Sequence, residues 1–341
     1  MKKRRKEDRS MKNPNVIGLD VGTSRIVTAR SAGGDKFEFA KQLNAFVSVP
    51  FSKMVERSLE RDGVRYDVQG DHLIVVGDDS PRFADLLHVE TRRPMTEGVL
   101  NPAEPESVPV IRKIIEGMVV DGDNRPTVWF SVPAAPLNAE EGLTYHEATL
   151  RQVFSDLGCE VQSINEGLAV VYSELEDTNY TGIGVSCGGG LCNVSLSFLS
   201  MPAMSFSIPK GGDFIDASAA SVTGDLANRV RLTKEENFHF NGHFVDKLHQ
   251  VLTVYYEDMM LSLINSMKEA FSDTRRMPKL NRPIPIVLAG GTSCPPGFRD
   301  RFERLLRATK FPVEISEVRM AQDAMTATAR GALIAALTEA D

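Results

Sequence analysis

Residues 17–27 of this 341-residue chain read IGLDVGTSRIV. Apolar and β-branched residues on both sides of the turn Gly22-Thr23-Ser24 predict a strand, a tight turn and a returning strand. A glycine turn at a strand end leaves backbone N–H groups uncovered, and rows of such donors bind anions, phosphate in particular. Asp20 places a carboxylate before the turn, where Mg²⁺ bound to a phosphate would need one. The pattern alone is also consistent with an ordinary hairpin in which Asp20 caps the turn.

The same pattern returns half a chain later. Residues 184–190 read GVSCGGG and can be aligned with GLDVGTS at residues 18–24. A third glycine turn, GGTS at residues 290–293, stands between an apolar run and a predicted helix, and glycine there allows a ligand to approach closely. Neither a Walker A loop nor a GxGxxG fingerprint is present. The repetition predicts two similar halves that face each other across a cleft.

Strand-like and helix-like segments alternate along the chain, which indicates a layered α/β fold. Asn138 with Glu141 forms a capping-box-like helix start. The three prolines of Asn101–Pro109 predict a loop. We expect strands within 16–30 and at 46–51, 73–76, 128–132, 182–186, 191–198 and 284–289, and helices from about 138 and at 164–175, 245–271, 296–308 and 321–337.

Composition excludes several classes of protein. The chain has 39 basic and 46 acidic side chains, a net charge of −7, which argues against a general nucleic-acid coat. No apolar run reaches the roughly 18 residues that span a bilayer. The four cysteines form neither a disulfide framework nor a paired zinc motif, so a cytoplasmic location is expected. The basic run at residues 2–9 is expected to be a disordered tail, with weak attraction to anionic lipid or nucleic acid as the alternative.

Six ordered motifs resemble those of the actin/sugar-kinase/DnaK-type chaperone ATPase superfamily, in particular bacterial actins of the MreB and MamK kind. They are IGLDVGTSRIV (17–27, phosphate-1), INEGLAVVY (164–172, connect-1), GVSCGGGLCNVSL (184–196, phosphate-2), SIPKGGDFID (207–216), IVLAGGTSCPPGF (286–298, adenosine) and ATARGALIAA (327–336, connect-2). RRPMTEGVLNP at residues 92–102 also resembles the RPMxDGV segment of MreB-type proteins. The resemblance implies an α/β fold with two similar actin-like (ribonuclease-H-like) lobes around a central nucleotide cleft.

The resemblance also implies where the lobes begin and end. Residues 1–14 would be the tail, residues 15–180 with 320–341 the first lobe, and residues 181–319 the second lobe. Small insertions are expected at about 50–95 in the first lobe and about 215–250 in the second.

By the same resemblance, the motifs would bind ATP and Mg²⁺. Asp20 would hold Mg²⁺ through water, and Glu166 would be the catalytic residue that orients or activates the attacking water. The remaining nucleotide-binding residues would be Gly22, Thr23, Ser24, Gly188, Gly189, Gly190, Gly211 and Gly212 around the phosphates, Lys234 and Glu235 at the ribose and base, and Gly290 and Gly291 along the adenosine. The alternatives are that Glu166 only stabilises a helix N-terminus, and that Lys234 and Glu235 are a solvated helix pair.

Other residue types carry less information. Cys187 and Cys192 fit buried small side chains better than a redox or metal pair. His239 and His243 lie four residues apart without an HExxH context, which favours surface or packing histidines.

The chain departs from the family pattern at Ser186, where the phosphate-2 strand usually carries Asp. Residues 191–193 read Leu-Cys-Asn in place of the usual Thr-Thr-Asp or Glu type. Because serine cannot supply negative charge to the Mg²⁺–water shell, we expect nucleotide binding with slow or altered hydrolysis, that is, a weak ATPase.

The first functional hypothesis is a cytoskeletal actin-like ATPase that self-associates head to tail, because an unclosed heterologous contact yields a filament. The alternative is a non-polymerising actin-fold scaffold or regulator that binds a protein partner. A protein adaptor is compatible with either hypothesis. No specific nucleic acid is expected, membrane contact stays open, and the choice between ATP and GTP is not determined by these motifs.

Overall fold

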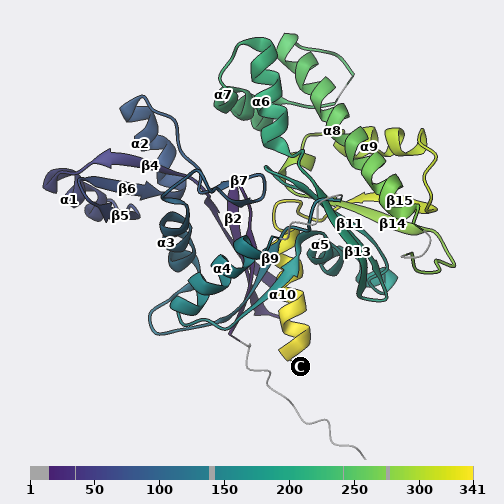
Figure 1. Cartoon of the computed structure of the whole chain (residues 1–341), viewed down its shortest axis with the longest axis horizontal. Helices are drawn as coiled ribbons and strands as arrows, with labels where there is room; N and C mark the ends of the chain where they lie inside the picture. The colour runs from purple at the N-terminus through teal and green to yellow at the C-terminus, as the bar shows by residue number, and fades with distance from the viewer. Residues whose placement is uncertain (1–14, 35, 138–142, 241, 274–276, 341) are drawn as a thin grey trace, which may run out of the picture.

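The computed structural model describes residues 15–34, 36–137, 143–240, 242–273 and 277–340. The basic N-terminal run and the predicted helix start at Asn138 lie outside the described residues. Two five-stranded sheets form the body of the molecule, with helices on both of their faces (Figure 1).

The first sheet is built around the hairpin quoted above. Its central strands β1 and β2 pair antiparallel, while β1 with β9 and β9 with β10 pair parallel. The strand order is β10 (Val161–Asn165), β9 (Thr127–Val132), β1 (Val16–Val21), β2 (Arg25–Gly33) and β3 (Lys36–Leu43). One face packs on α3 (Ser107–Val119) and α4 (Thr144–Asp156), and the other on α10 (Ala327–Ala340).

The second sheet repeats this construction. Strands β11 and β12 form the antiparallel hairpin, while β11 with β14 and β14 with β15 pair parallel. The strand order is β13 (Met201–Ile208), β12 (Cys192–Phe198), β11 (Gly182–Cys187), β14 (Ile284–Ala289) and β15 (Ile315–Met320). Its core packs on α8 (Lys247–Phe271) and α9 (Phe298–Arg307). The prediction of an α/β fold with two similar lobes is confirmed.

Helices α5 (Glu166–Glu174) and α10 cross between the two sheets (Figure 1). Glycines at the crossing permit a very close approach, since a Cβ atom on Gly331 would clash with the carbonyl group of Ala169. The central strands show the same relation twice, because a Cβ on Gly18 of β1 would clash with α10 and one on Gly184 of β11 would clash with α5. Each half therefore packs its central strand directly onto one of the two crossing helices.

Smaller elements extend each half at the upper side of the molecule (Figure 1). In the first half they have their own apolar core and a three-stranded sheet. They are β4 (Phe46–Pro50), α1 (Lys53–Arg61), β5 (Tyr66–Gln69), β6 (His72–Val76) and α2 (Ser80–Leu87), followed by the hairpin of β7 (Met95–Thr96) and β8 (Val99–Leu100). In the second half they are α6 (Gly212–Thr223) and α7 (Ala227–Asn237).

Several predicted boundaries differ from those of the structure, and three of the differences have a clear physical reason. Ile164 belongs to β10, and the helix begins at Glu166 because the Asn165 side chain caps it by accepting from Gly167 N and Leu168 N. Helix α3 begins at Ser107 inside the predicted loop, since a proline in the first helical turn loses no hydrogen bond. The last helix begins at Ala327, six residues late, because residues 322–326 form turns against the second sheet. Within the described ranges, no helix is long and apolar enough to cross a bilayer.

Candidate functional site

The two glycine turns have the same local geometry. Gly22 N donates to Arg25 O over 3.1 Å, and Gly188 N donates to Leu191 O over 2.9 Å. Each turn joins the central strand of its sheet to an antiparallel neighbour. The similarity predicted from sequence therefore extends to the backbone.

The turns also touch each other. A Cβ atom on Gly189 would clash with Ser24 Oγ, and one on Gly190 would lie 2.7 Å from Thr23 Oγ1. Real Cβ atoms do not approach other atoms so closely. At Gly190 the nearest atom is backbone, Gly98 N at 2.4 Å, so a side chain there would force the neighbouring backbone to move, whereas at Gly189 the Ser24 hydroxyl would have to turn away. Residues 22–24 and 188–190 form one continuous floor.

A cavity of about 650 Å³ lies over this floor. It is lined by the predicted residues Asp20, Gly22, Thr23, Ser24, Glu166, Gly188, Gly189, Gly190, Gly212, Lys234, Glu235, Gly290 and Gly291. Gly211 is the exception: it packs behind the floor, where its Cβ would meet Gly188 O at 2.7 Å. The tertiary structure thus brings residues from both halves of the chain to one cleft.

Two carboxylates lie on one side of the cavity. Asp20 accepts a hydrogen bond from Ser131 Oγ (2.7 Å), and Glu166 Oε2 accepts from both Asn193 Nδ2 (2.9 Å) and Ser186 Oγ (3.2 Å). Burial raises the pKa of Asp20 to about 6. Burial, and secondarily the charge of Asp20, raises the pKa of Glu166 to about 8. Like charges held close together out of water suit a proton or a cation, and Mg²⁺ needs only one or two protein carboxylates.

Because of this carboxylate pair, we expect the ligand-free protein to be more stable at mildly acidic pH than at pH 8. Since both folded-state pKa values lie above the ordinary 3.8 and 4.5, the folded state binds more protons than the unfolded state between about pH 4 and pH 8. The free energy of unfolding should therefore fall as pH rises through this window, by up to about 1.4 kcal/mol per pH unit for each proton. Urea unfolding at several pH values measures the slope, and Glu166→Gln should flatten its upper half. An unchanged slope in that variant would contradict the assignment.

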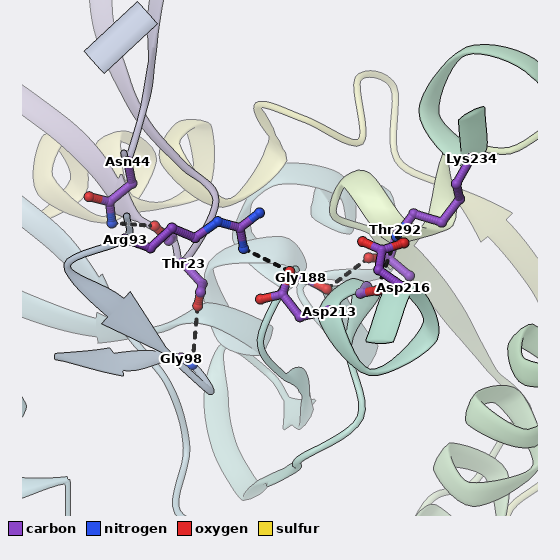
Figure 2. Close-up of polar contacts among 11 residues, drawn as sticks. Thr23, Asn44, Arg93, Gly98, Gly188, Asp213, Asp216, Lys234 and Thr292 are labelled. Carbon is purple, nitrogen blue, oxygen red and sulfur yellow. Dashed lines mark hydrogen bonds and ion pairs between the residues drawn. The ribbon is translucent and has the colours of Figure 1, made fainter. Parts of the chain in front are cut away.

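Also in the wall of the cavity, Lys234 of α7 forms a buried ion pair with Asp216 of α6 (Figure 2). Lys234 Nζ lies 2.7 Å from Asp216 Oδ1 and donates to Gly212 O over 3.1 Å; the two side chains are only 7% and 6% exposed. Glu235 is exposed and lies 3.5 Å from Arg25 of the first half. Lys234 is therefore not part of a solvated helix pair, although Glu235 is solvated.

Segment 92–98 links the halves beside the floor, a role that the sequence did not assign to any single residue. The link is the contact of Arg93 Nη1 with Asp213 Oδ1 of α6, at 2.7 Å (Figure 2). Within the first half, Gly98 N donates to Thr23 Oγ1 over 3.1 Å and so ties the segment to the floor. Arg231, also not singled out, lines the cavity; burial and then Arg93 lower the pKa of its guanidinium. No local pattern distinguishes Arg93 and Arg231 from solvated arginines, because their surroundings are assembled by tertiary packing.

The remaining candidate residues lie as follows. Cys187 and Cys192 face each other across β11 and β12 and are buried in the core of the second half. His239 lines the cavity, and its ring lies 5.0 Å from that of His249. His243 is exposed.

The two duplicated hairpin sheets, the crossing helices and the shared cleft define an actin-like fold. Solved structures agree over nearly the whole chain. A MamK double helical filament is 19% identical with a TM-score of 0.71, covering 94% of this chain and 98% of that one. MreB5 of Spiroplasma citri bound to AMPPNP is 13% identical with a TM-score of 0.67, covering 95% and 96%. The ethanolamine utilization protein EutJ from Carboxydothermus hydrogenoformans is 17% identical with a TM-score of 0.54, covering 93% and 89%.

Comparison of the sequence with family profiles gives a narrower assignment than the fold does. No curated protein sequence matches the chain. The profile of the Volactin family matches residues 16–336, and the chain belongs to the Volactin family.

Proposed function

We propose that this protein binds Mg-ATP in the cleft and polymerises into filaments in response. The observation that carries the proposal is the continuous floor of two glycine turns beneath a 650 Å³ cavity. Gly22 N and Gly188 N donate within their own turns, so the phosphate donors would be the N–H groups that follow them, at residues 23–24 and 189–190. The cavity has the size usual for small-ligand sites. Asp20 would hold Mg²⁺ through water, and Glu166 would face the attacking water.

The known structures support the proposal in two ways. MreB5 was solved with AMPPNP and with ADP, and a MamK variant was solved with AMPPNP. MamK was also solved as a double helical filament. We further propose that residues 15–180 with 320–341 form one lobe and residues 181–319 the other. Nucleotide bound between the lobes would bias their relative angle, and the angle would in turn control the head-to-tail contact between subunits.

The test is polymerisation of the full chain with and without Mg-ATP. We expect high-speed pelleting and filaments in negative stain only when nucleotide and Mg²⁺ are both present, together with slow phosphate release. ATP binding without pelleting would support the alternative, a non-polymerising actin-fold scaffold that binds a protein partner. Absence of ATP binding would overturn both.

Ser186 provides a sharper prediction about hydrolysis. The side chain lines the cavity and supplies no charge there. Ser186→Asp would add a carboxylate on the second-lobe side of the proposed Mg²⁺–water shell, so phosphate release should accelerate by about tenfold, equivalent to ~1.4 kcal/mol in the barrier. Single-turnover phosphate release at saturating Mg²⁺ measures it. The matched control is Ser186→Asn, which has the same shape without the charge; a rate equal to or below that of the parent in Ser186→Asp would remove the idea.

A further inference from the structure

Asn193 of β12 stands out among the polar residues of the cleft because it is almost fully buried, at 1% exposure, and uses both ends of its amide. Its Oδ1 accepts from the backbone of Ala134 over 2.8 Å, and its Nδ2 donates to Glu166 Oε2 over 2.9 Å. Since a backbone N–H can only donate, the amide oxygen must face Ala134 and the amide nitrogen must face Glu166. The orientation of the amide is therefore determined by the first half of the chain.

The surroundings of Ala134 hold this arrangement in place. Ala134 follows β9 of the first sheet, and the adjoining residues lie along β13 of the second, where Ser207 N donates to Ala135 O over 3.0 Å. Asn193 itself belongs to the second sheet, while Glu166 begins the crossing helix α5. One side chain thus connects both sheets and the helix between them.

The consequence for Glu166 is asymmetric. Ser186 and Asn193 both donate to Oε2, whereas Oε1 has no hydrogen-bond partner within the described part of the chain. Glu166 lines the cavity. A carboxylate held through one oxygen presents the lone pairs of the other in a defined direction, which is what orientation of a water molecule requires.

We propose that Asn193 is a positioning residue for ATP hydrolysis, which acts by holding Glu166 so that its free oxygen orients the attacking water. This inference rests on the proposed function, because it concerns the hydrolytic step of the same site. Asn193 itself contacts neither phosphate nor water in this account; its effect passes through Glu166. A merely structural amide would instead stabilise the fold and the cleft without any preference for the hydrolytic step.

The experiment is a double-mutant cycle on the full chain with ATP as the probe. Equilibrium ATP affinity and single-turnover phosphate release are measured for the parent, Asn193→Ala, Glu166→Gln and the double variant. We expect Asn193→Ala to slow phosphate release by at least about tenfold, as befits support of a positioned acid–base group, with ATP affinity within roughly threefold of the parent. The double variant should be no slower than Glu166→Gln alone, because the effect of Asn193 depends on the Glu166 carboxylate.

Ser195→Ala is the matched control. Ser195 lies two residues further along β12 and is equally buried. Within the described residues its hydroxyl hydrogen-bonds to Ser205 Oγ at 2.9 Å and not to Glu166, so its loss should leave phosphate release unchanged. The inference would be overturned if the two substitutions slowed phosphate release independently, so that their fold-changes multiplied in the double variant. It would also be overturned if Asn193→Ala lowered ATP affinity as much as the rate of phosphate release. If the parent binds ATP but releases no phosphate, the inference fails while the proposed function survives. If the parent does not bind ATP, both fail.

Discussion

Replacing Lys234 with methionine should lower the free energy of unfolding by about 3–5 kcal/mol, because it leaves the buried Asp216 carboxylate without its partner. Both side chains are more than nine-tenths buried, so water cannot replace the lost ion pair. The same change removes a cation from the wall of the cavity and should weaken ATP binding. Urea unfolding and an equilibrium nucleotide-binding assay measure the two effects.

The pH dependence of this loss provides the check. Burial already raises the pKa of Asp216 to about 6 despite the opposing effect of Lys234. Without the lysine that pKa must rise further, so the folded variant holds a proton that the unfolded chain releases above about pH 4. The destabilisation should therefore be smaller at pH 5 than at pH 8. The double variant Lys234→Met/Asp216→Asn, which buries no charge, should recover much of the loss; equal destabilisation at both pH values, or no recovery, would contradict an ion-pair role.

The second large effect is expected from Gly331→Ala at the helix crossing. In an exposed helix this change stabilises by about 1 kcal/mol, because alanine has the higher helix propensity. Here the new methyl group would clash with the carbonyl group of Ala169 in α5, so α5 and α10 must separate. We expect a net loss of about 3 kcal/mol or more, at the upper end of the usual cost of overpacking.

Thr338→Ala is the control, because it changes an exposed position of the same helix and should alter stability by no more than about 0.5 kcal/mol. Chemical denaturation of both variants gives the change in the free energy of unfolding. A loss of stability in Gly331→Ala indicates the clash with α5, whereas a gain indicates that helix propensity dominates. A midpoint for Gly331→Ala equal to or above that of the parent would show that the crossing tolerates a side chain. Since α5 carries Glu166 at its first residue, the structure also predicts that Gly331→Ala slows any hydrolysis.

Local signals predicted the parts of the site that depend on neighbouring residues. Each glycine turn is encoded by a few consecutive residues between strand-forming runs, and both were predicted from sequence. The helix that carries Glu166 was placed two residues early, because Ile164 and Asn165 fit either the end of a strand or the start of a helix. The Asn165 cap resolves this ambiguity, because it makes Glu166 the first residue of the helix.

Contacts between distant residues could not be predicted in the same way. Arg93 and Asp213 are 120 positions apart, and Asn193 and Glu166 are 27 apart. No spacing rule links such pairs, and each side chain alone is typical of a solvated or core position. The same limit applies to Ser186, which the sequence presents only as a missing carboxylate but which the structure shows donating a hydrogen bond to Glu166.

By itself, the order of motifs determined that two equivalent strand–turn–strand units exist and that each ends in glycines able to expose backbone donors. Only the packed chain decided that Gly189 and Gly190 press against Ser24 and Thr23, that Lys234 is sheltered from water, and that Gly211 sits behind the floor. The physical reason is the distance along the chain over which each property is determined. Backbone torsions respond to adjacent residues, whereas burial and electrostatic partnership depend on which surfaces the whole fold removes from water.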